Sequence, residues 1–485
     1  MSPANHSRTT GKRRSIKTRF ERDSLGEREV PQEAYWGIQT LRAVENFPVS
    51  SITAKPVFIT ATAMVKAASA EANMALGLID RKRGRAIEKA AMEVAGGVFN
   101  SQFVVDAYQA GAGTSHNMNA NEVIANRAIE LLGGRRGEYR KIHPNDHVNM
   151  SQSTNDTMPT ALRVAALLSL PSLLASLTGL ERALSRKAAS FDKVMKSGRT
   201  HLQDAVPITL GQEFGSWAAA VRSSIARIKT ASEGLKRIGL GGTATGTGMN
   251  THPAYRKKVL SALSEVSRLK GLKQAPDGFE ALNSMGDFAA FSGAMRNAAT
   301  ELVRIANDLR LLGSGPRTGL SEIRLPPVQP GSSIMPGKTN PVMAEMLDMV
   351  CFQVIGNDLA VSLASQAGQL ELNVMLPVIN YNLLQSMEIM TNSVKVFTTR
   401  CVAGIKADRK RCAAYLESSV GLATILNRFI GYEKAAGVAK EAEKSGRSIK
   451  EVTIEMGLLT EDGWKKLLTP SVITMPADLR RIKLK

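Results

Sequence analysis

Long stretches rich in alanine, leucine and methionine recur through the chain, and they constrain its fold more than any other feature. Five of them occupy residues 56–76, 158–190, 210–240, 290–312 and 380–403. In a sixth, 342–356, apolar side chains recur at steps of three and four residues, as on one face of a helix. Helices that are apolar over much of their surface must bury it against other helices. We therefore predict a mainly α protein with a long helical bundle and with helices shared between subunits.

Composition excludes several other classes of protein. Aromatic residues make up 5% of the 485 residues, which is few for an all-β protein of this size. The cysteines Cys351, Cys401 and Cys412 are odd in number and form no C-x-x-C pair, so we exclude a disulfide scaffold and expect a reducing cytoplasm. Residues 164–180 are uncharged but contain Pro171 and several hydroxyl side chains. This pattern favours a buried helix of a soluble protein over a membrane span.

The chain is strongly basic, with 63 Lys and Arg against 43 Asp and Glu and a net charge of +20. Half of this excess lies in residues 1–20 and 480–485, which contain no acidic residue. We expect residues 1–20 to form a disordered arm, with an organellar transit peptide and a nucleic-acid-binding arm as alternatives. No charged stretch interleaved with aromatic residues occurs elsewhere, which argues against a nucleic-acid partner. An anionic small molecule is equally compatible with the charge.

Four polar segments interrupt the helical pattern, and each leads into a predicted helix. They read GAGTSHNMNANE (111–122), MSQSTNDTMPT (150–160), SGRTHLQDAVP (197–207) and GSSIMPGKTNP (331–341). Helix capping explains part of them, because Asn119 with Glu122 resembles a capping box and Asn340 before Pro341 resembles an N-cap. Capping does not require four segments of this length. Small side chains and free backbone N–H groups near helix N-termini also suit an anion site, so we interpret the set as functional.

Three motifs that would bind phosphate, a dinucleotide or a metal ion are each incomplete. GSSIMPGKT has five residues between Gly331 and Gly337 where a P-loop has four, and prolines precede it in place of a strand. Residues 239–244 satisfy G-x-G-x-x-A but follow a charged helical segment. The two histidines of IHPNDH (142–147) have a proline between them and lack companion ligands. We therefore expect no cofactor and no metal.

The segment 331–341 has side chains suited to proton abstraction beside a carboxylate. A serine hydroxyl hardly ionises near neutral pH, and a nearby ammonium with converging N–H donors would stabilise its alkoxide. Lys338 and Asn340 are suited to hold a substrate carboxylate. Removing a hydrogen beside a carboxylate also requires fixed donors around the enediolate-like oxygens that result. Residue chemistry alone thus favours a lyase that acts on an anion.

The same segment resembles the signature G-S-x-x-M-P-x-K-x-N-P of the aspartase/fumarase superfamily. The other three polar segments resemble the remaining active-site segments of that superfamily in the same order. The resemblance implies a three-domain lyase whose central bundle forms a tetrameric helical core, with each active site assembled from three subunits. After the basic tail 1–20, it places the domains at 21–154, 155–410 and 411–485. It also implies a reversible, cofactor-free elimination that yields fumarate or a relative of fumarate.

By position, the resemblance gives a role to each polar segment. Ser332 would be the catalytic base that removes the Cβ proton. Lys338 and Asn340 would bind the substrate carboxylate, and Ser333 would help to stabilise the intermediate. The substrate pocket would be lined by Thr114, Ser115, Ser153, Thr154, Asn155, Thr200 and His201.

His201 has two alternative roles. It matches a histidine that fumarases are thought to use as a catalytic acid with a glutamate, here Glu345. Some aspartases have glutamine at this position, which is compatible with substrate hydrogen bonding alone. We favour the hydrogen-bonding role.

Features of the aspartase and fumarase branches are mixed in this chain. Resemblance to aspartases comes from Ser115, Thr154 and the segments 25–48 and 370–378. Resemblance to fumarases comes from the segments 142–147 and 241–253. A hydroxyl-rich pocket can accept hydrogen bonds from the ammonium of aspartate. We therefore favour the reversible elimination of ammonia from L-aspartate to give fumarate, through an aci-carboxylate intermediate, with the L-malate reaction of class II fumarases as the alternative.

Overall fold

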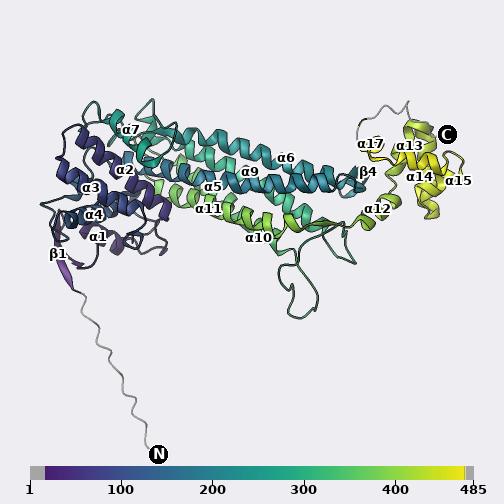
Figure 1. Cartoon of the computed structure of the whole chain (residues 1–485), viewed down its shortest axis with the longest axis horizontal. Helices are drawn as coiled ribbons and strands as arrows, with labels where there is room; N and C mark the ends of the chain where they lie inside the picture. The colour runs from purple at the N-terminus through teal and green to yellow at the C-terminus, as the bar shows by residue number, and fades with distance from the viewer. Residues whose placement is uncertain (1–16, 475, 477–485) are drawn as a thin grey trace, which may run out of the picture. The chain divides into compact units, whose positions relative to one another are not determined.

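The computed structural model describes residues 17–474 and 476, and most of them lie in helices (Figure 1). The first helices are α1 (Ile38–Asn46), α2 (Pro56–Ala75), α3 (Arg81–Ala95), α4 (Thr114–Leu131), α5 (Thr154–Ser190), α6 (Leu210–Ser232), α7 (Tyr255–Ser267) and α8 (Glu280–Asn283). The later helices are α9 (Gly286–Leu312), α10 (Val342–Gln366), α11 (Leu376–Arg400), α12 (Arg409–Ser418), α13 (Leu422–Ile430), α14 (Tyr432–Ser445), α15 (Ile449–Glu455), α16 (Glu461–Leu467) and α17 (Pro470–Ile473). The predicted mainly α class is confirmed.

The strands of the described residues form small two-stranded sheets. The antiparallel pairs are β1 (Thr18–Asp23) with β2 (Gly26–Pro31), β3 (Met195–Thr200) with β4 (Gln203–Thr209), and β7 (Ile323–Arg324) with β8 (Lys406–Ala407). The parallel pair is β5 (Arg237–Ile238) with β6 (Lys273–Gln274). None of these sheets is large enough to form a core of its own, so helices carry the fold.

By its internal contacts the chain divides into two compact units. Unit 1 comprises the described residues up to Ser169 together with Ala231–Phe291 and Leu359–Gln385. Unit 2 comprises Leu170–Thr230, Ser292–Asp358 and the described residues from Ser386 onward. Every passage from one unit to the other falls inside one of the long helices α5, α6, α9, α10 and α11. The expected division into three domains stays a prediction.

Alanine-rich helices form the core of unit 1. α2 packs against α3 and α7, and α3 packs against α4. The buried side chains between them include Ala63, Ala67, Ala90, Ala125 and Ile87. Because alanine ends at Cβ, helices that bury alanine on several sides approach one another closely and leave little room for larger side chains.

The N-terminal hairpin corrects the expected end of the basic tail. β1 begins at Thr18, so residues 18–20, which we expected in the tail, belong to a strand pair. Arg19 is almost buried, pairs with Glu21, and donates to four backbone carbonyls between residues 31 and 36 at 2.8–3.3 Å. The fork of N–H donors in a guanidinium suits such a cluster of oxygens. The rest of the tail, residues 1–16, and the basic residues 480–485 lie outside the described residues.

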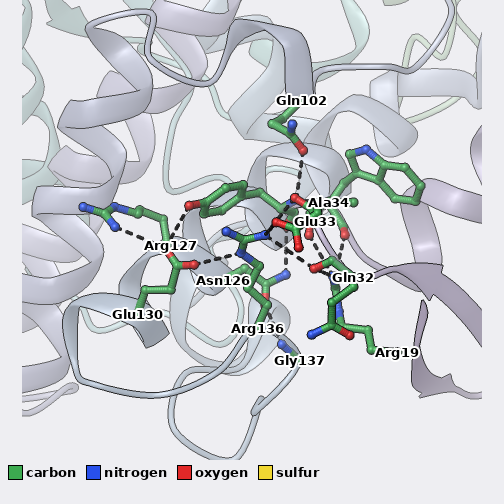
Figure 2. Close-up of polar contacts among 12 residues, drawn as sticks. Arg19, Gln32, Glu33, Ala34, Gln102, Asn126, Arg127, Glu130, Arg136 and Gly137 are labelled. Carbon is green, nitrogen blue, oxygen red and sulfur yellow. Dashed lines mark hydrogen bonds and ion pairs between the residues drawn. The ribbon is translucent and has the colours of Figure 1, made fainter. Parts of the chain in front are cut away.

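A second arginine secures the loop that follows this hairpin. Arg136 donates to the backbone carbonyl of Glu33 and to the carboxylate of Glu130, both at 2.8 Å (Figure 2). Its guanidinium carbon also lies 3.9 Å from the centre of the Tyr35 ring, in a cation–π contact. Figure 2 shows Arg19, which belongs to β1, beside Gln32 and Ala34 of this loop. Two guanidinium groups thus bind carbonyl oxygens of this loop and of the residue before it.

Asn119 and Glu122 lie inside α4, so the predicted capping box between them is wrong. The carboxylate of Glu122 caps a different helix, α1, by accepting the backbone N–H groups of residues 37, 39 and 40 at 2.8–3.1 Å. Asn119 donates its amide to the backbone carbonyl of Gln102 at 2.9 Å. Burial raises the pKa of Glu122 to about 7, although the donors around it act in the opposite direction.

A buried cluster of four charges holds the β3–β4 hairpin in unit 2. Lys196 lies 2.7 Å from a carboxylate oxygen of Glu322 and 2.9 Å from one of Glu213. Arg199, farther along β3, lies 2.9 Å from the other Glu322 oxygen. Burial raises the pKa of Glu213, and the Lys196 ammonium opposes that shift. Two cations and two carboxylates balance one another, as buried charges must.

The C-terminal helices of unit 2 have a core of their own. α13 packs against α14, and α14 packs against α15. Buried side chains there include Leu422, Leu426, Val438, Val452 and Trp464. These helices lie within the stretch 411–485 for which we predicted a small helical domain.

α5 and α10 are long and apolar enough to cross a membrane by length and composition alone. In α5, 56% of the most apolar window is buried inside the structure, as in the core helix of a soluble protein. In α10 the corresponding share is 39%, so this helix exposes more of its apolar surface.

Candidate active site

The first polar segment forms the beginning of α4 in unit 1. A short 3₁₀ helix, η2 (Gly111–Gly113), precedes it, and left-handed backbone conformations at Ala112 (φ 61°) and Gly113 (φ 88°) turn the chain into α4. Thr114 is exposed and donates its hydroxyl to a carbonyl of η2, whereas Ser115 is buried. Both side chains line a cavity of about 530 Å³, which is large enough for a small organic acid.

The second polar segment forms the beginning of α5, also in unit 1. Ser153 and Thr154 line a second cavity of about 540 Å³. This cavity shares Met118 and Asn145 with the first one, so the two cavities have a common wall. The structure therefore brings the first two polar segments together, as the interpretation of them as one functional set requires.

A loop that we did not assign to the site lines the second cavity. It contributes Thr243, Ala244, Thr245, Thr247, Met249 and Asn250. Asn155 donates its side-chain amide to the carbonyl of Ala244 at 2.8 Å, so this predicted pocket residue supports the loop. The sequence GGTATGTGMNTHP (241–253) is as rich in glycine and threonine as the four polar segments, and this composition was the available signal.

A buried carboxylate joins this loop to the second polar segment. Asp156 is fully buried and accepts the backbone N–H groups of Ser153 (2.9 Å), Gly241 (2.8 Å) and Thr243 (2.9 Å). Burial raises the pKa of Asp156 to about 6, while these N–H groups and the charge of Lys66 lower it. Asp156 thus holds two walls of the cavity at fixed positions.

A buried lysine lies behind the same cavity. Lys66, on α2, is fully buried, and its ammonium donates to Asn117 (2.8 Å), Asn149 (2.9 Å) and Gln152 (3.0 Å). Burial lowers the pKa of Lys66 to about 7, and the charge of Asp156 opposes this shift. In the sequence, the only signal was a single lysine within the apolar run FITATAMVKAASA.

The third polar segment forms the β3–β4 hairpin of unit 2. Thr200 pairs with Gln203, so His201 and Leu202 are the two loop residues, with φ values of 55° and 61°. Two consecutive left-handed residues are typical of a type I′ turn, which usually contains Asn or Gly. Thr200 and His201 are both exposed, at the tip of a hairpin whose base is held by the buried charge cluster.

The fourth polar segment is a loop of unit 2 closed by its own hydrogen bonds. The N–H of Gly331 donates to the carbonyl of Lys338 (2.7 Å), and the Asn340 amide donates to the carbonyl of Gly331 (2.8 Å). The hydroxyl oxygen of Ser332 accepts two backbone N–H groups, from Ile334 at 3.2 Å and Met335 at 3.1 Å. Two converging donors at this oxygen are what an alkoxide would require.

Other residues of this loop are open to solvent or lie just after it. Ser333 and Lys338 are exposed, and Glu345 lies in the first turn of α10. α10 begins at Val342, so the predicted N-cap at Asn340 is wrong. The Asn340 amide closes the loop instead, and the carbonyl of Pro341 accepts the N–H of Glu345 (3.2 Å).

The predicted site residues therefore form two sets, one in each unit. Unit 1 carries Thr114, Ser115, Ser153, Thr154 and Asn155; unit 2 carries Thr200, His201, Ser332, Ser333, Lys338 and Asn340. Except for Asn155, the residues of the first set line cavities, whereas most of the second set is exposed on a turn and a loop. Between residues 17 and 474, no group of three or more His, Cys, Asp or Glu side chains is arranged to hold a metal ion.

Comparison with known proteins identifies the family of the chain. Residues 26–356 match a protein-family model described as a lyase, and residues 422–475 match the model of the fumarase C C-terminus. The chain belongs to the aspartase/fumarase superfamily. The structure of a fumarate lyase:delta crystallin from Brucella melitensis bound to cobalt has a TM-score of 0.92 and 50% identity, covering 95% of this chain and 100% of that chain.

Two curated relatives represent the two branches of the superfamily. An aspartate ammonia-lyase from Bacillus sp is 50% identical over 458 residues, which cover 94% of this chain and 98% of the relative. A fumarate hydratase class II from Bradyrhizobium diazoefficiens is 46% identical over 460 residues, which cover 95% of this chain and 97% of the relative. Both share nearly their whole length with this chain, and the ammonia-lyase is the more similar of the two.

Proposed function

We propose that this protein is an aspartate ammonia-lyase, which eliminates ammonia from L-aspartate to give fumarate in a reversible reaction. The observation that carries the proposal is the near-complete overlap with an aspartate ammonia-lyase at 50% identity, joined to cavities lined by hydroxyl and amide side chains. Such side chains recognise carboxylates through several directed hydrogen bonds. The substrate is accordingly a small dicarboxylate.

The first chemical step is assigned to Ser332. Its alkoxide takes the proton from Cβ, and the electron pair of the broken C–H bond moves into the adjacent carboxylate to give the aci-carboxylate. The two N–H groups that converge on the Ser332 oxygen support this role, because they stabilise a negative charge there. Lys338 binds a substrate carboxylate as a point charge, Asn340 assists it, and the exposed Ser333 donates to the intermediate.

The second step breaks the Cα–N bond. The electron pair returns from the aci-carboxylate to form the double bond of fumarate, and the nitrogen leaves with its own bonding pair. Because the leaving group of L-aspartate is an ammonium, it departs as neutral ammonia and needs no added proton. Hydroxide, by contrast, is a poor leaving group and requires an acid. This difference supports hydrogen bonding to the substrate, rather than acid catalysis, as the role of His201, with Thr200 beside it.

We place the working enzyme as a homotetramer with each active site shared by three subunits. α10 supports this assembly, because Met349 (64%), Phe352 (57%), Leu359 (61%) and Leu363 (53%) are exposed at spacings that fall on one face of the helix. An apolar stripe of this kind is buried by neighbouring helices in an assembly. Residues of both sets then meet across subunits. The buried free cysteines are compatible with a cytoplasmic location.

The deciding experiment compares L-aspartate with L-malate as substrates. Purified protein is given each compound at the same concentration, and fumarate is followed by its ultraviolet absorbance. We expect the higher kcat/KM with L-aspartate. A higher value with L-malate would overturn the proposal in favour of fumarate hydratase.

A serine variant tests the assignment of the base. We expect Ser332→Ala to lower kcat by at least about 100-fold, the range of general acid–base catalysis, without changing the assembly seen by size-exclusion chromatography. Thr339→Ala, in the same loop, is the matched control and should retain activity. A Ser332→Ala variant within a few-fold of the parent would remove Ser332 from the mechanism.

A further inference from the structure

The buried ammonium of Lys66 has contacts that fix the orientation of three side-chain amides. Its three N–H donors meet three amide oxygens, those of Asn117, Asn149 and Gln152. A lysine ammonium has three donors and no acceptor, so each of these amides must direct its oxygen toward Lys66. All three amide residues line the 540 Å³ cavity, whereas Lys66 does not. Lys66 therefore acts on the cavity only through its neighbours.

The fixed amide of Asn117 in turn sets the hydrogen bonding of Thr154. With its oxygen held by Lys66, Asn117 donates from its nitrogen to the Thr154 hydroxyl oxygen (3.1 Å) and to the Asn149 amide oxygen (3.2 Å). The Thr154 oxygen is thus an acceptor from the protein. Among the described residues 17–474, no acceptor receives the Thr154 hydroxyl hydrogen, so that hydrogen is available to a ligand in the cavity.

We infer that Lys66 is a positioning residue, which through Asn117 makes the Thr154 hydroxyl a hydrogen-bond donor to a substrate carboxylate. The inference rests on the proposed function only in that the substrate carries a carboxylate. It changes the role first expected for Thr154, which was to accept a hydrogen bond from the substrate ammonium. The charge of Lys66 is balanced by the buried Asp156, which also holds the cavity walls.

A double-mutant cycle tests whether Lys66 and Thr154 act as one unit. Lys66→Met gives an unbranched side chain one atom shorter and without the charge, and Thr154→Val removes the hydroxyl at constant shape. Loss of one hydrogen bond to a charged group lowers kcat/KM by about 10- to 100-fold. We expect each single variant to show such a loss. The kcat/KM of the double variant should lie within about threefold of that of the less active single variant.

Thr160→Val provides the matched control for this cycle. Thr160 lies farther along α5, and its hydroxyl donates to the backbone carbonyl of Asp156 at 2.7 Å without lining the cavity. Its effect and that of Lys66→Met should multiply. If the losses from Lys66→Met and Thr154→Val also multiply, Lys66 supports the fold alone and the inference is overturned.

A second variant keeps the test valid if Lys66→Met does not fold. Asn117→Asp retains a partner for Lys66 but replaces the amide donor with a carboxylate, which takes the Thr154 hydrogen for itself. We expect it to raise the Kd for succinate, measured by calorimetry, about as much as Thr154→Val does. An unchanged Kd would overturn the inference.

Succinate separates this inference from the proposed function. It carries two carboxylates but neither an ammonium nor a hydroxyl, so its binding does not depend on which compound is the natural substrate. A preference of the parent protein for L-malate would refute the proposed function and leave the succinate result in force. Parent protein that binds no succinate would refute the inference on Thr154 directly.

Discussion

Replacing Glu322 with glutamine tests the charge cluster that holds the β3–β4 hairpin. The side chain of Glu322 is fully buried, and each of its oxygens faces a different cation, Lys196 at 2.7 Å and Arg199 at 2.9 Å. Glutamine has nearly the same shape but no charge, and its NH₂ group would face one of the two cations. The substitution therefore leaves one excess positive charge inside unit 2 without changing its volume.

The size of the effect follows from these distances. A pair of unit charges 2.7 Å apart attract each other by about 6 kcal/mol at an effective dielectric constant of about 20. The cost of removing both ions from water offsets part of this attraction, and breaking a buried pair leaves a net loss of about 3–5 kcal/mol. Lys196 keeps Glu213 as a partner, so we expect Glu322→Gln to lie near the lower end, at about 3 kcal/mol.

Urea unfolding followed by circular dichroism measures this loss of stability. Urea is uncharged and leaves the ion pairs unscreened, whereas guanidinium chloride is a salt and would screen them. A thermal midpoint gives a second readout, where about 3 kcal/mol corresponds to a decrease of about 6–12 °C in a unit of this size. Glu213→Gln is the control, because that side chain is 25% exposed and pairs with the same Lys196. It should cost about 1 kcal/mol. An equal or larger effect at Glu213, or a Glu322→Gln midpoint within about 1 °C of the parent, would refute the reasoning.

Two further predictions concern unit 1. Asp23 accepts two hydrogen bonds from Arg42, at 2.8 and 2.9 Å, and these lower the pKa of its carboxyl. The stabilisation by this pair is therefore present above the pKa of Asp23 in the unfolded chain. It is lost as the pH falls through the lower pKa of the folded state. Asp23→Asn should flatten the loss of thermal stability between about pH 5 and pH 3, and an unchanged pH profile would contradict this. Gly246 has φ 107°, and a Cβ there would lie 2.5 Å from the backbone of Gly278. Gly246→Ala should therefore lower the melting temperature and distort the loop that lines the second cavity. The control Gly437→Ala, on α14, places its Cβ in open space and should leave the melting temperature unchanged.

Features of the fold that depend on neighbouring residues were predictable from the sequence. The helix at 342–366 follows from apolar side chains at steps of three and four, and the helix at 56–75 follows from its content of alanine and methionine, since both signals act within one helix. The four polar segments were recognised by composition, and the structure places the first two on cavities with a common wall. Their roles in catalysis stay predictions.

Features that depend on distant residues were missed or wrongly assigned. Glu122 matched a capping box with Asn119, three residues away, yet it caps α1, whose first residue is Ile38. Lys66 stood out only as one charge in an apolar helix, because its three amide partners come from later segments. Arg19 was counted with a solvated tail for the same reason. Long-range polar pairing has no periodic signature in a sequence, so only the folded chain reveals it.

The contacts of Arg19 bear on how this protein can be handled in the laboratory. One guanidinium gathers four carbonyl oxygens between residues 31 and 36, so the loop after β2 depends on an intact β1. The backbone carbonyl of Lys17 also accepts the N–H of Gln32 at 2.8 Å, so Lys17 belongs with the folded part. A proteolytic cut after Arg19 would therefore release the loop that Figure 2 shows it holding.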